Sequence, residues 1–158
     1  MRLPAPLAAA HRAYRATGAD LPFGDPLPAH GVAMEGYFWR VSDRESGRAL
    51  IALIGVNRDG DGEHWATLGL GTHPSGFLRT AEHPEAAADA RRLGASAGSA
   101  FVATLGRVQV DLGEDARLDL RISGHARWPH RIVGGSSVFQ AVPALNQYWH
   151  PWLLGGSA

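Results

Sequence analysis

The chain has 158 residues, enough for one domain with a sizeable core, and 45% of them are hydrophobic, which excludes a disordered protein. Its 15 basic residues balance 15 acidic ones, so no net charge draws it to nucleic acid or to an anionic membrane, and neither is expected as a partner. Cysteine is absent, which excludes a disulfide, a thiolate metal site and a cysteine nucleophile.

The first 30 residues are predicted to form a short helix and a surface arm. The opening apolar stretch is broken by Pro4 and Pro6 and is too short for a secretory signal, so the cytoplasm is the expected location. No stretch approaches the roughly 20 apolar residues of a transmembrane helix. Residues 7–17 favour a helix that ends at Gly18, whereas the prolines of residues 21–28 exclude a central strand and indicate an arm.

Residues 31–158 are predicted to form one all-β module of antiparallel strands. Residues 33–41 alternate between the two faces of a strand, 49–56 are continuously apolar, and 64–70 follow a strong turn signal at 57–62. Strands that recur about every ten residues, with turn signals between them, indicate a barrel or a sandwich. Nothing resembles the strand–helix alternation of a parallel sheet.

The clearest predicted hairpin joins residues 107–112 to residues 117–122. Both stretches alternate strictly and a polar turn separates them. Alternation directs their apolar side chains toward the core, namely Val108, Val110, Leu112, Leu118, Leu120 and Ile122. Residues 82–98 are rich in Ala and Arg, and one or two turns of helix are expected there, limited by Gly94 and Gly98.

Several features that resemble known motifs fit simpler structures better. Residues 57–62 lack the complete Asp spacing of a calcium loop and are typical of a hairpin turn. The eight histidines are scattered, so no metal site is predicted. Residues 134–137 lack the second Gly of a nucleophile elbow, and the G-x-G at 69–71 precedes a His-Pro pair that cannot begin a phosphate-binding helix. No cofactor is therefore predicted.

Two aromatic clusters carry the strongest functional signal, at residues 37–39 and 148–152. Alternate aromatic side chains of a barrel strand point inward, where they either fill the core or form the wall of a hydrophobic pocket. Polar residues accompany both clusters, as they do in small-molecule sites. The predicted ligand-binding residues are Tyr37, Trp39, Arg40, Gln140, Asn146, Trp149, His150 and Trp152.

Glu35 is the candidate catalytic acid. Alternation places it on the same strand face as Tyr37 and Trp39, and places Phe38 and Arg40 on the other. If the face of Glu35 is interior, burial raises the pKa of its carboxyl group and makes it a possible proton donor. The alternative is a buried structural pair between Glu35 and an arginine.

Two stretches of the chain resemble the tocopherol cyclase-like proteins. Residues 34–41 read M-E-G-Y-F-W-R-V and resemble the opening strand of that family, E-G-W-Y-F-[KR]-V. Residues 148–158 are similar to its aromatic tract that leads into Gly-Gly. Tyr37 stands where the family usually has Trp, and the sequence ends at Ala158, where the family continues into a second module. The resemblance therefore covers an N-terminal module only.

The resemblance implies a lipocalin-like (calycin-type) barrel, or half of a two-module barrel protein, related to the carotenoid hydratases. It also implies an isomerase or lyase that cyclises or hydrates a prenyl lipid, in which a buried acid protonates an isoprenoid alkene and aromatic faces stabilise the cation. Two alternatives stay open. One is a non-catalytic carrier of a hydrophobic small molecule, and the other is a structural module completed by a second module or a second copy of the chain.

Overall fold

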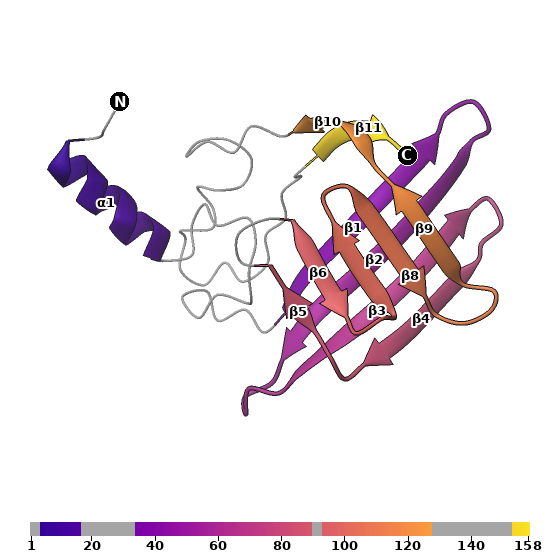
Figure 1. Cartoon of the computed structure of the whole chain (residues 1–158), viewed down its shortest axis with the longest axis horizontal. Coiled ribbons are helices and arrows are strands. Elements are labelled where there is room, and N and C mark those ends of the chain that lie inside the picture. The colour runs from indigo at the N-terminus through magenta and orange to yellow at the C-terminus, as the bar shows by residue number, and fades with distance from the viewer. Residues whose placement is uncertain (1–3, 17–33, 90–92, 128–152) are drawn as a thin grey trace.

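The computed structural model describes residues 4–16, 34–89, 93–127 and 153–158, which form one helix and eleven strands (Figure 1). The helix, α1, spans Ala5–Ala16. The strands are β1 (Met34–Asp43), β2 (Arg48–Arg58), β3 (His64–His73), β4 (Leu78–His83), β5 (Ala87–Ala88), β6 (Gly94–Ala97), β7 (Phe101–Thr104), β8 (Arg107–Asp111), β9 (Arg117–Arg121), β10 (Ser123–Arg127) and β11 (Leu153–Ser157). The predicted all-β class with a short N-terminal helix is confirmed.

Every strand of the two main sheets pairs antiparallel with its neighbour in the sequence. β1 to β4 form a four-stranded sheet, β5 to β9 form a five-stranded sheet, and β10 pairs with β11. The two main sheets lie one over the other and their strands cross (Figure 1). No ladder joins β4 to β5 in this part of the chain, so these strands form a sandwich rather than a closed barrel wall. Pro84, directly after β4, has no N–H group for a further ladder bond.

The predicted hairpin turn at residues 57–62 is confirmed. β2 ends at Arg58, β3 begins at His64, and the two strands pair along their whole length. The carboxylate of Asp59 accepts the backbone N–H groups of Asp61 and Glu63, each at 2.9 Å. The same side chain that suggested a calcium loop therefore closes the turn.

The helical turns expected within residues 82–98 are absent from the described part of that stretch, and the prediction was wrong. The stretch instead contains β5, β6 and the end of β4. Ala95 and Ala97 of β6 are 5% and 0% exposed, because their small side chains let the five-stranded sheet pack closely against its neighbour. Tertiary packing has overridden the helix propensity of alanine.

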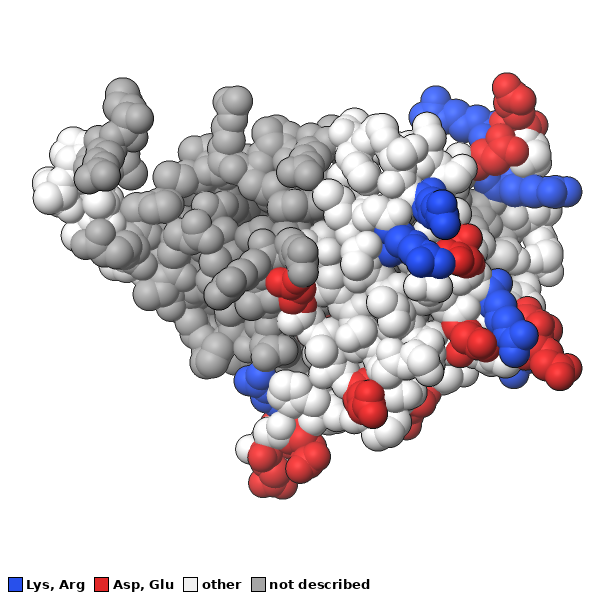
Figure 2. Space-filling model, viewed as in Figure 1, with Lys and Arg blue, Asp and Glu red and all other residues white. Residues whose placement is uncertain are grey.

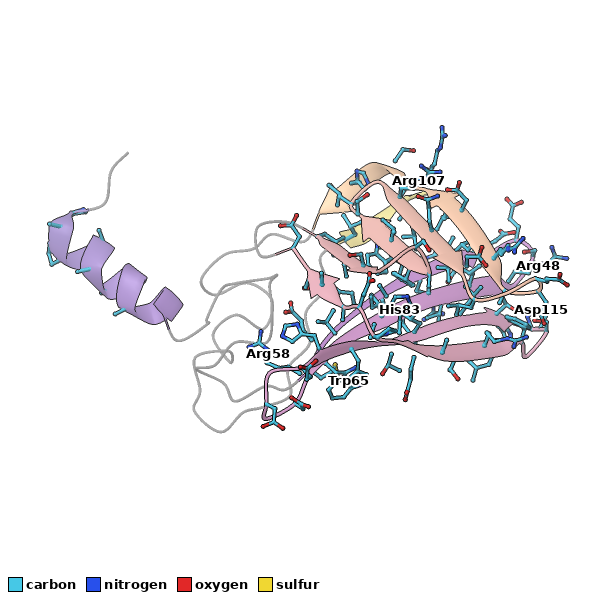
Figure 3. All side chains as sticks on the ribbon, turned by 60° about the horizontal axis from the view of Figure 1, so that its bottom comes forward. Arg48, Arg58, Trp65, His83, Arg107 and Asp115 are labelled. Carbon is cyan, nitrogen blue, oxygen red and sulfur yellow. The ribbon has the colours of Figure 1, made fainter. Side chains whose placement is uncertain are left out.

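The hydrophobic core lies between the two main sheets, as the layers of side chains in Figure 3 show. The predicted inward residues of the β8–β9 hairpin all belong to it: Val108 and Val110 are buried, and the other four apolar residues of that hairpin are partly buried. The largest fully buried side chains are Phe101, Ile54, Leu68, Val56 and Val108. Each such side chain contributes about 1.5–3 kcal/mol to folding by leaving water.

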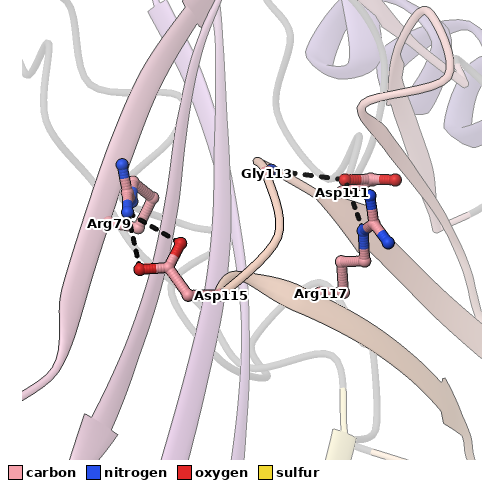
Figure 4. Close-up of polar contacts among 5 residues, drawn as sticks. All are labelled: Arg79, Asp111, Gly113, Asp115 and Arg117. Atoms are coloured by element: carbon pink, nitrogen blue, oxygen red, sulfur yellow. Dashed lines mark hydrogen bonds and ion pairs between the residues drawn. The ribbon is translucent and has the colours of Figure 1, made fainter.

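Charged side chains remain on the surface, where both signs are interspersed on the face shown in Figure 2. Three arginine–aspartate pairs are described: Arg79–Asp115 and Arg117–Asp111, drawn in Figure 4, and Arg107–Asp119. Their side chains are about half exposed. Such pairs contribute little to stability, but two of them lower the pKa of their carboxylates, those of Asp111 and Asp119.

The pair between Arg107 and Asp119 gives a first testable prediction. Two hydrogen bonds from Arg107, at 2.8 and 2.6 Å, lower the pKa of Asp119, aided by the charges of Arg107 and Arg121 and opposed by desolvation. The stabilisation is therefore complete above about pH 4, the pKa range of an unfolded Asp, and is lost as the pH falls through the lower folded-state pKa.

Replacing Arg107 with Gln should raise the pKa of Asp119 toward its ordinary value in a carboxyl ¹³C NMR titration. Asp111 is the internal control, because its pKa is lowered by Arg117 and by the N–H of Gly113 rather than by Arg107. An unchanged titration of Asp119 in the variant would contradict the assignment of the shift to this pair.

Candidate functional site

The aromatic cluster of β1 has one side in the core and the other in solvent. Tyr37 and Trp39 are only 7% and 6% exposed, whereas Phe38 between them is 49% exposed. The predicted alternation is thus confirmed: Glu35, Tyr37 and Trp39 share the inner face of the sheet.

Three aromatic rings form a continuous path from one sheet to the other. The rings of Tyr37 and Trp39 stack with centroids 6.5 Å apart, and the ring of Trp39 lies 5.9 Å from that of Phe101 on β7. The indole Nε1 of Trp39 is buried and has no hydrogen-bond partner in the described part of the protein. A buried N–H without an acceptor costs about 1–3 kcal/mol, and a ligand oxygen is one group that would satisfy it.

Glu35 lies at the end of this aromatic path. Its side chain is half-buried, and its Oε1 accepts a hydrogen bond from the hydroxyl of Tyr37. The contact follows from the strand, because residues two apart lie on the same face and a tyrosine is long enough to reach back. A carboxyl group held beside a phenol and an apolar face can carry a proton to a bound molecule.

Strand register brings further titratable side chains to the same end of the inner face. Glu35 pairs with Val56, Val56 with Ala66, and Ala66 with His83. Arg58 and His64 form the next pair along β2 and β3. This group is termed the polar end and consists of Glu35, Arg58, His64 and His83.

Two hydrogen bonds fix the histidines of the polar end. The Nε of Arg58 donates to Nε2 of His64 at 2.8 Å. The backbone N–H of Glu85 donates to Nδ1 of His83 at 3.0 Å. Figure 3 places Arg58 at the end of the four-stranded sheet, and His83 on the same sheet. The printed distances therefore describe two separate contacts at this end of the sheet, Arg58 with His64 and His83 with the backbone of Glu85.

Arg58, His64 and His83 were not predicted as site residues. Arg58 and His64 flank the turn at residues 57–62, and pairing the strands on either side of it would have placed them opposite each other. His83 lies near the start of residues 82–98, where no strand was predicted, so its place at the end of β4 was missed.

One further predicted site residue, Arg40, does not join this arrangement. Arg40 is exposed on the opposite face of β1, where its Nε donates to the hydroxyl of Ser42 at 3.2 Å. The remaining five lie outside the described residues: Gln140, Asn146, Trp149, His150 and Trp152.

A pocket of about 570 Å³ opens at the other end of β1, away from the polar end. Its lining is formed by Val41, Asp43, Arg48, Ala49, Leu50, Thr72, His73, Pro74 and Ser75. The hydroxyl of Ser46 and the N–H of Glu45 lower the pKa of Asp43 and keep it ionised near neutral pH. Of the predicted site residues that the structure describes, none lines this pocket.

The chain matches no family model, no curated protein and no solved structure. Among the described residues, no cluster of three or more His, Cys, Asp or Glu side chains is arranged to hold a metal ion. The described part of the chain also contains no helix with the length and apolarity needed to span a membrane. The case for a site therefore rests on geometry, above all on Glu35 beside Tyr37 and Trp39.

Proposed function

We propose that this protein binds a prenyl lipid against Tyr37 and Trp39, and that Glu35 protonates an isoprenoid double bond, as the resemblance to tocopherol cyclase-like proteins implies. The observation that carries the proposal is the hydrogen bond between Tyr37 and Glu35 on an inward, aromatic strand face. Catalytic acids are typically found where a carboxyl group meets apolar surroundings and an oriented partner.

The proposed reaction needs no cofactor. The carboxyl proton of Glu35 adds to one alkene carbon, the π electrons form the new C–H bond, and the other carbon becomes a tertiary cation. A hydroxyl group of the same substrate attacks the cation in cyclisation, or water attacks it in hydration. The oxygen then loses its proton to the carboxylate of Glu35, which restores the acid. The faces of Tyr37 and Trp39 suit such a cation through their quadrupoles.

A carrier of an oxygen-bearing apolar molecule is the second candidate function. The specific observation that favours it is the buried Nε1 of Trp39, which a ligand oxygen would satisfy without any reaction. Quenching of tryptophan fluorescence by a prenylated quinol, with no ring-closed product, is the result that would select the carrier.

Replacing Glu35 with Gln tests the catalytic proposal directly. The wild-type protein, incubated with a prenylated quinol, should form the ring-closed isomer, which chromatography separates from the substrate. The variant should form it about 10²–10⁴-fold more slowly, because the amide supplies no acidic proton. Glu114→Gln is the matched control, since Glu114 is exposed in the β8–β9 turn. Equal rates for Glu35→Gln and wild type would remove Glu35 from the mechanism.

A further inference from the structure

The inner face of the four-stranded sheet becomes accessible at the end where β1 turns into β2. The last buried row of side chains across this face consists of Trp39, Ala52 and Leu70, which are 6%, 0% and 4% exposed. The next row toward the β1–β2 turn consists of Val41, Leu50 and Thr72, which are half-buried. These three side chains line the pocket of about 570 Å³. The pocket therefore lies where the hydrophobic core ends.

The size of this pocket and part of its lining suit an apolar group of a small molecule. Its volume lies within the range of about 300–1,000 Å³ that is typical of ligand pockets. Val41 and Leu50 supply methyl groups to the lining, and Leu50 also packs against the hydrophobic core. A short apolar chain that contacts these two side chains would leave water, which favours binding.

Arg48 is the charged lining residue with unused hydrogen-bonding atoms. It pairs in register with Asp43, the other charged residue of the lining. Both carboxylate oxygens of Asp43 already accept hydrogen bonds from the β1–β2 turn, from the N–H of Glu45 at 3.0 Å and from the hydroxyl of Ser46 at 2.5 Å. The guanidinium of Arg48, by contrast, forms no hydrogen bond or ion pair with any residue that the structure describes. Its N–H donors are therefore available to a ligand.

Two hydroxyl groups of the lining add a further donor. Oγ1 of Thr72 and Oγ of Ser75 lie 2.5 Å apart, so one hydroxyl donates to the other. The hydroxyl that accepts this bond keeps its own proton for another acceptor. The backbone N–H of Phe77 donates to Oγ of Ser75 at 3.3 Å and helps to orient the pair. Arg48 and this hydroxyl pair thus offer donors to the pocket, as the binding of an anion requires.

We propose that this pocket binds a monocarboxylate with a short apolar chain. Arg48 and the Thr72–Ser75 pair would hold the carboxylate, since a guanidinium matches two carboxylate oxygens, and Val41 and Leu50 would contact the chain. The negative charge of Asp43 beside Arg48 favours a singly charged ligand over a dianion. This site is separate from that of the proposed function, because Glu35 lies at the opposite end of β1.

Octanoate is the probe that tests the proposal, with 1-octanol as its uncharged analogue and octylammonium as its cationic one. Each is titrated into the full chain with ¹³C-labelled methyl groups. Octanoate should shift the signals of Val41 and Leu50 in a saturable manner and leave that of Val102, which is 38% exposed on the five-stranded sheet, unchanged. It should bind at least about fivefold more tightly than 1-octanol, because only the carboxylate forms charge-assisted hydrogen bonds.

Replacing Arg48 with Gln should weaken octanoate binding about five- to tenfold and leave the binding of 1-octanol unchanged. Arg44→Gln is the matched control, since Arg44 is exposed in the same turn but does not line the pocket. Glu35→Gln should bind octanoate as the wild type does, which separates this test from that of the proposed reaction. Methyl spectra of the free variants check that each one is folded.

Four results would overturn the proposal. They are the absence of saturable shifts at Val41 and Leu50, equal affinities for octanoate and 1-octanol, tighter binding of octylammonium than of octanoate, and equal weakening by the Arg48 and Arg44 substitutions. The second result would leave an apolar groove without selectivity for charge, and the third would assign the ligand to Asp43 instead of Arg48.

Discussion

Replacing Phe101 with alanine should lower the free energy of unfolding by about 3–5 kcal/mol, the range for deleting a fully buried phenylalanine. Phe101 is 0% exposed, and its ring lies 5.9 Å from that of Trp39. It is thus the residue through which the five-stranded sheet contacts the aromatic path of the four-stranded sheet. Its loss leaves a cavity between the two main sheets, which no backbone ladder joins in the described part of the chain. Urea unfolding, followed by tryptophan fluorescence, measures the change.

Val102→Ala is the matched control for Phe101→Ala. Val102 is the next residue of β7, but its side chain is on the outer side of the sheet and 38% exposed. Its truncation should change the unfolding free energy by less than about 1 kcal/mol, since little apolar surface is returned to water. If the two variants lost similar amounts of unfolding free energy, Phe101 would not be a residue of the hydrophobic core between the two sheets.

The Gly98→Ala substitution should lower the free energy of unfolding by about 2–3 kcal/mol, less than Phe101→Ala. Gly98 has a φ of 50°, in the left-handed region where a Cβ atom is strained. A Cβ there would also lie 2.7 Å from Cε1 of His83 and 3.2 Å from Oε2 of Glu85. Alanine would therefore push the imidazole of the polar end from its hydrogen bond with Glu85.

The Gly76→Ala substitution separates the two causes of the expected loss, which are backbone strain at a positive φ and the clash of the new Cβ with His83 and Glu85. Gly76 has a φ of 70°, but an added Cβ would meet nothing within 4 Å. It should lose only the backbone strain, about 1 kcal/mol, and leave the ¹⁵N chemical shifts of the His83 ring unchanged. Gly98→Ala should shift them. Equal losses of stability, with no shift of His83 in either variant, would contradict close packing of Gly98 against His83.

The parts of the fold that could be predicted from the sequence are those governed by local periodicity. The alternation of residues 34–41 placed Tyr37 and Trp39 on the inner face, and the strict alternation of residues 107–122 predicted the β8–β9 hairpin. Each of these signals needs only the neighbouring residues, because a side chain's face is determined by its parity along the strand.

Residues 82–98 could not be predicted in this way, because an alanine-rich stretch satisfies both a helix and a closely packed strand. What decides between them is the opposite sheet, which requires small side chains at Ala95 and Ala97. The break between β4 and β5 likewise depends on which sheet each strand joins. Pro84 shows where the break lies in the sequence, but the sequence does not show that β4 and β5 belong to different sheets.

The candidate site was predictable to the same extent. Glu35 and its aromatic neighbours come from one strand, so alternation alone grouped them. Arg58, His64 and His83 come from three other strands, and their approach depends on the register of two hairpins. Strand register follows from the length of each turn and from hydrogen bonds within it, such as those that the Asp59 carboxylate accepts. Amino-acid composition does not reveal the register.

Pairing between consecutive strands has a consequence for how the molecule forms. Each hairpin of the two main sheets closes only a short loop, so the entropy lost in bringing its strands together is small. The strands of each sheet can therefore pair in chain order as the polypeptide leaves the ribosome. We expect the contact between the two sheets, such as that of Trp39 with Phe101, to form more slowly than the hairpins, because these residues are far apart in the chain.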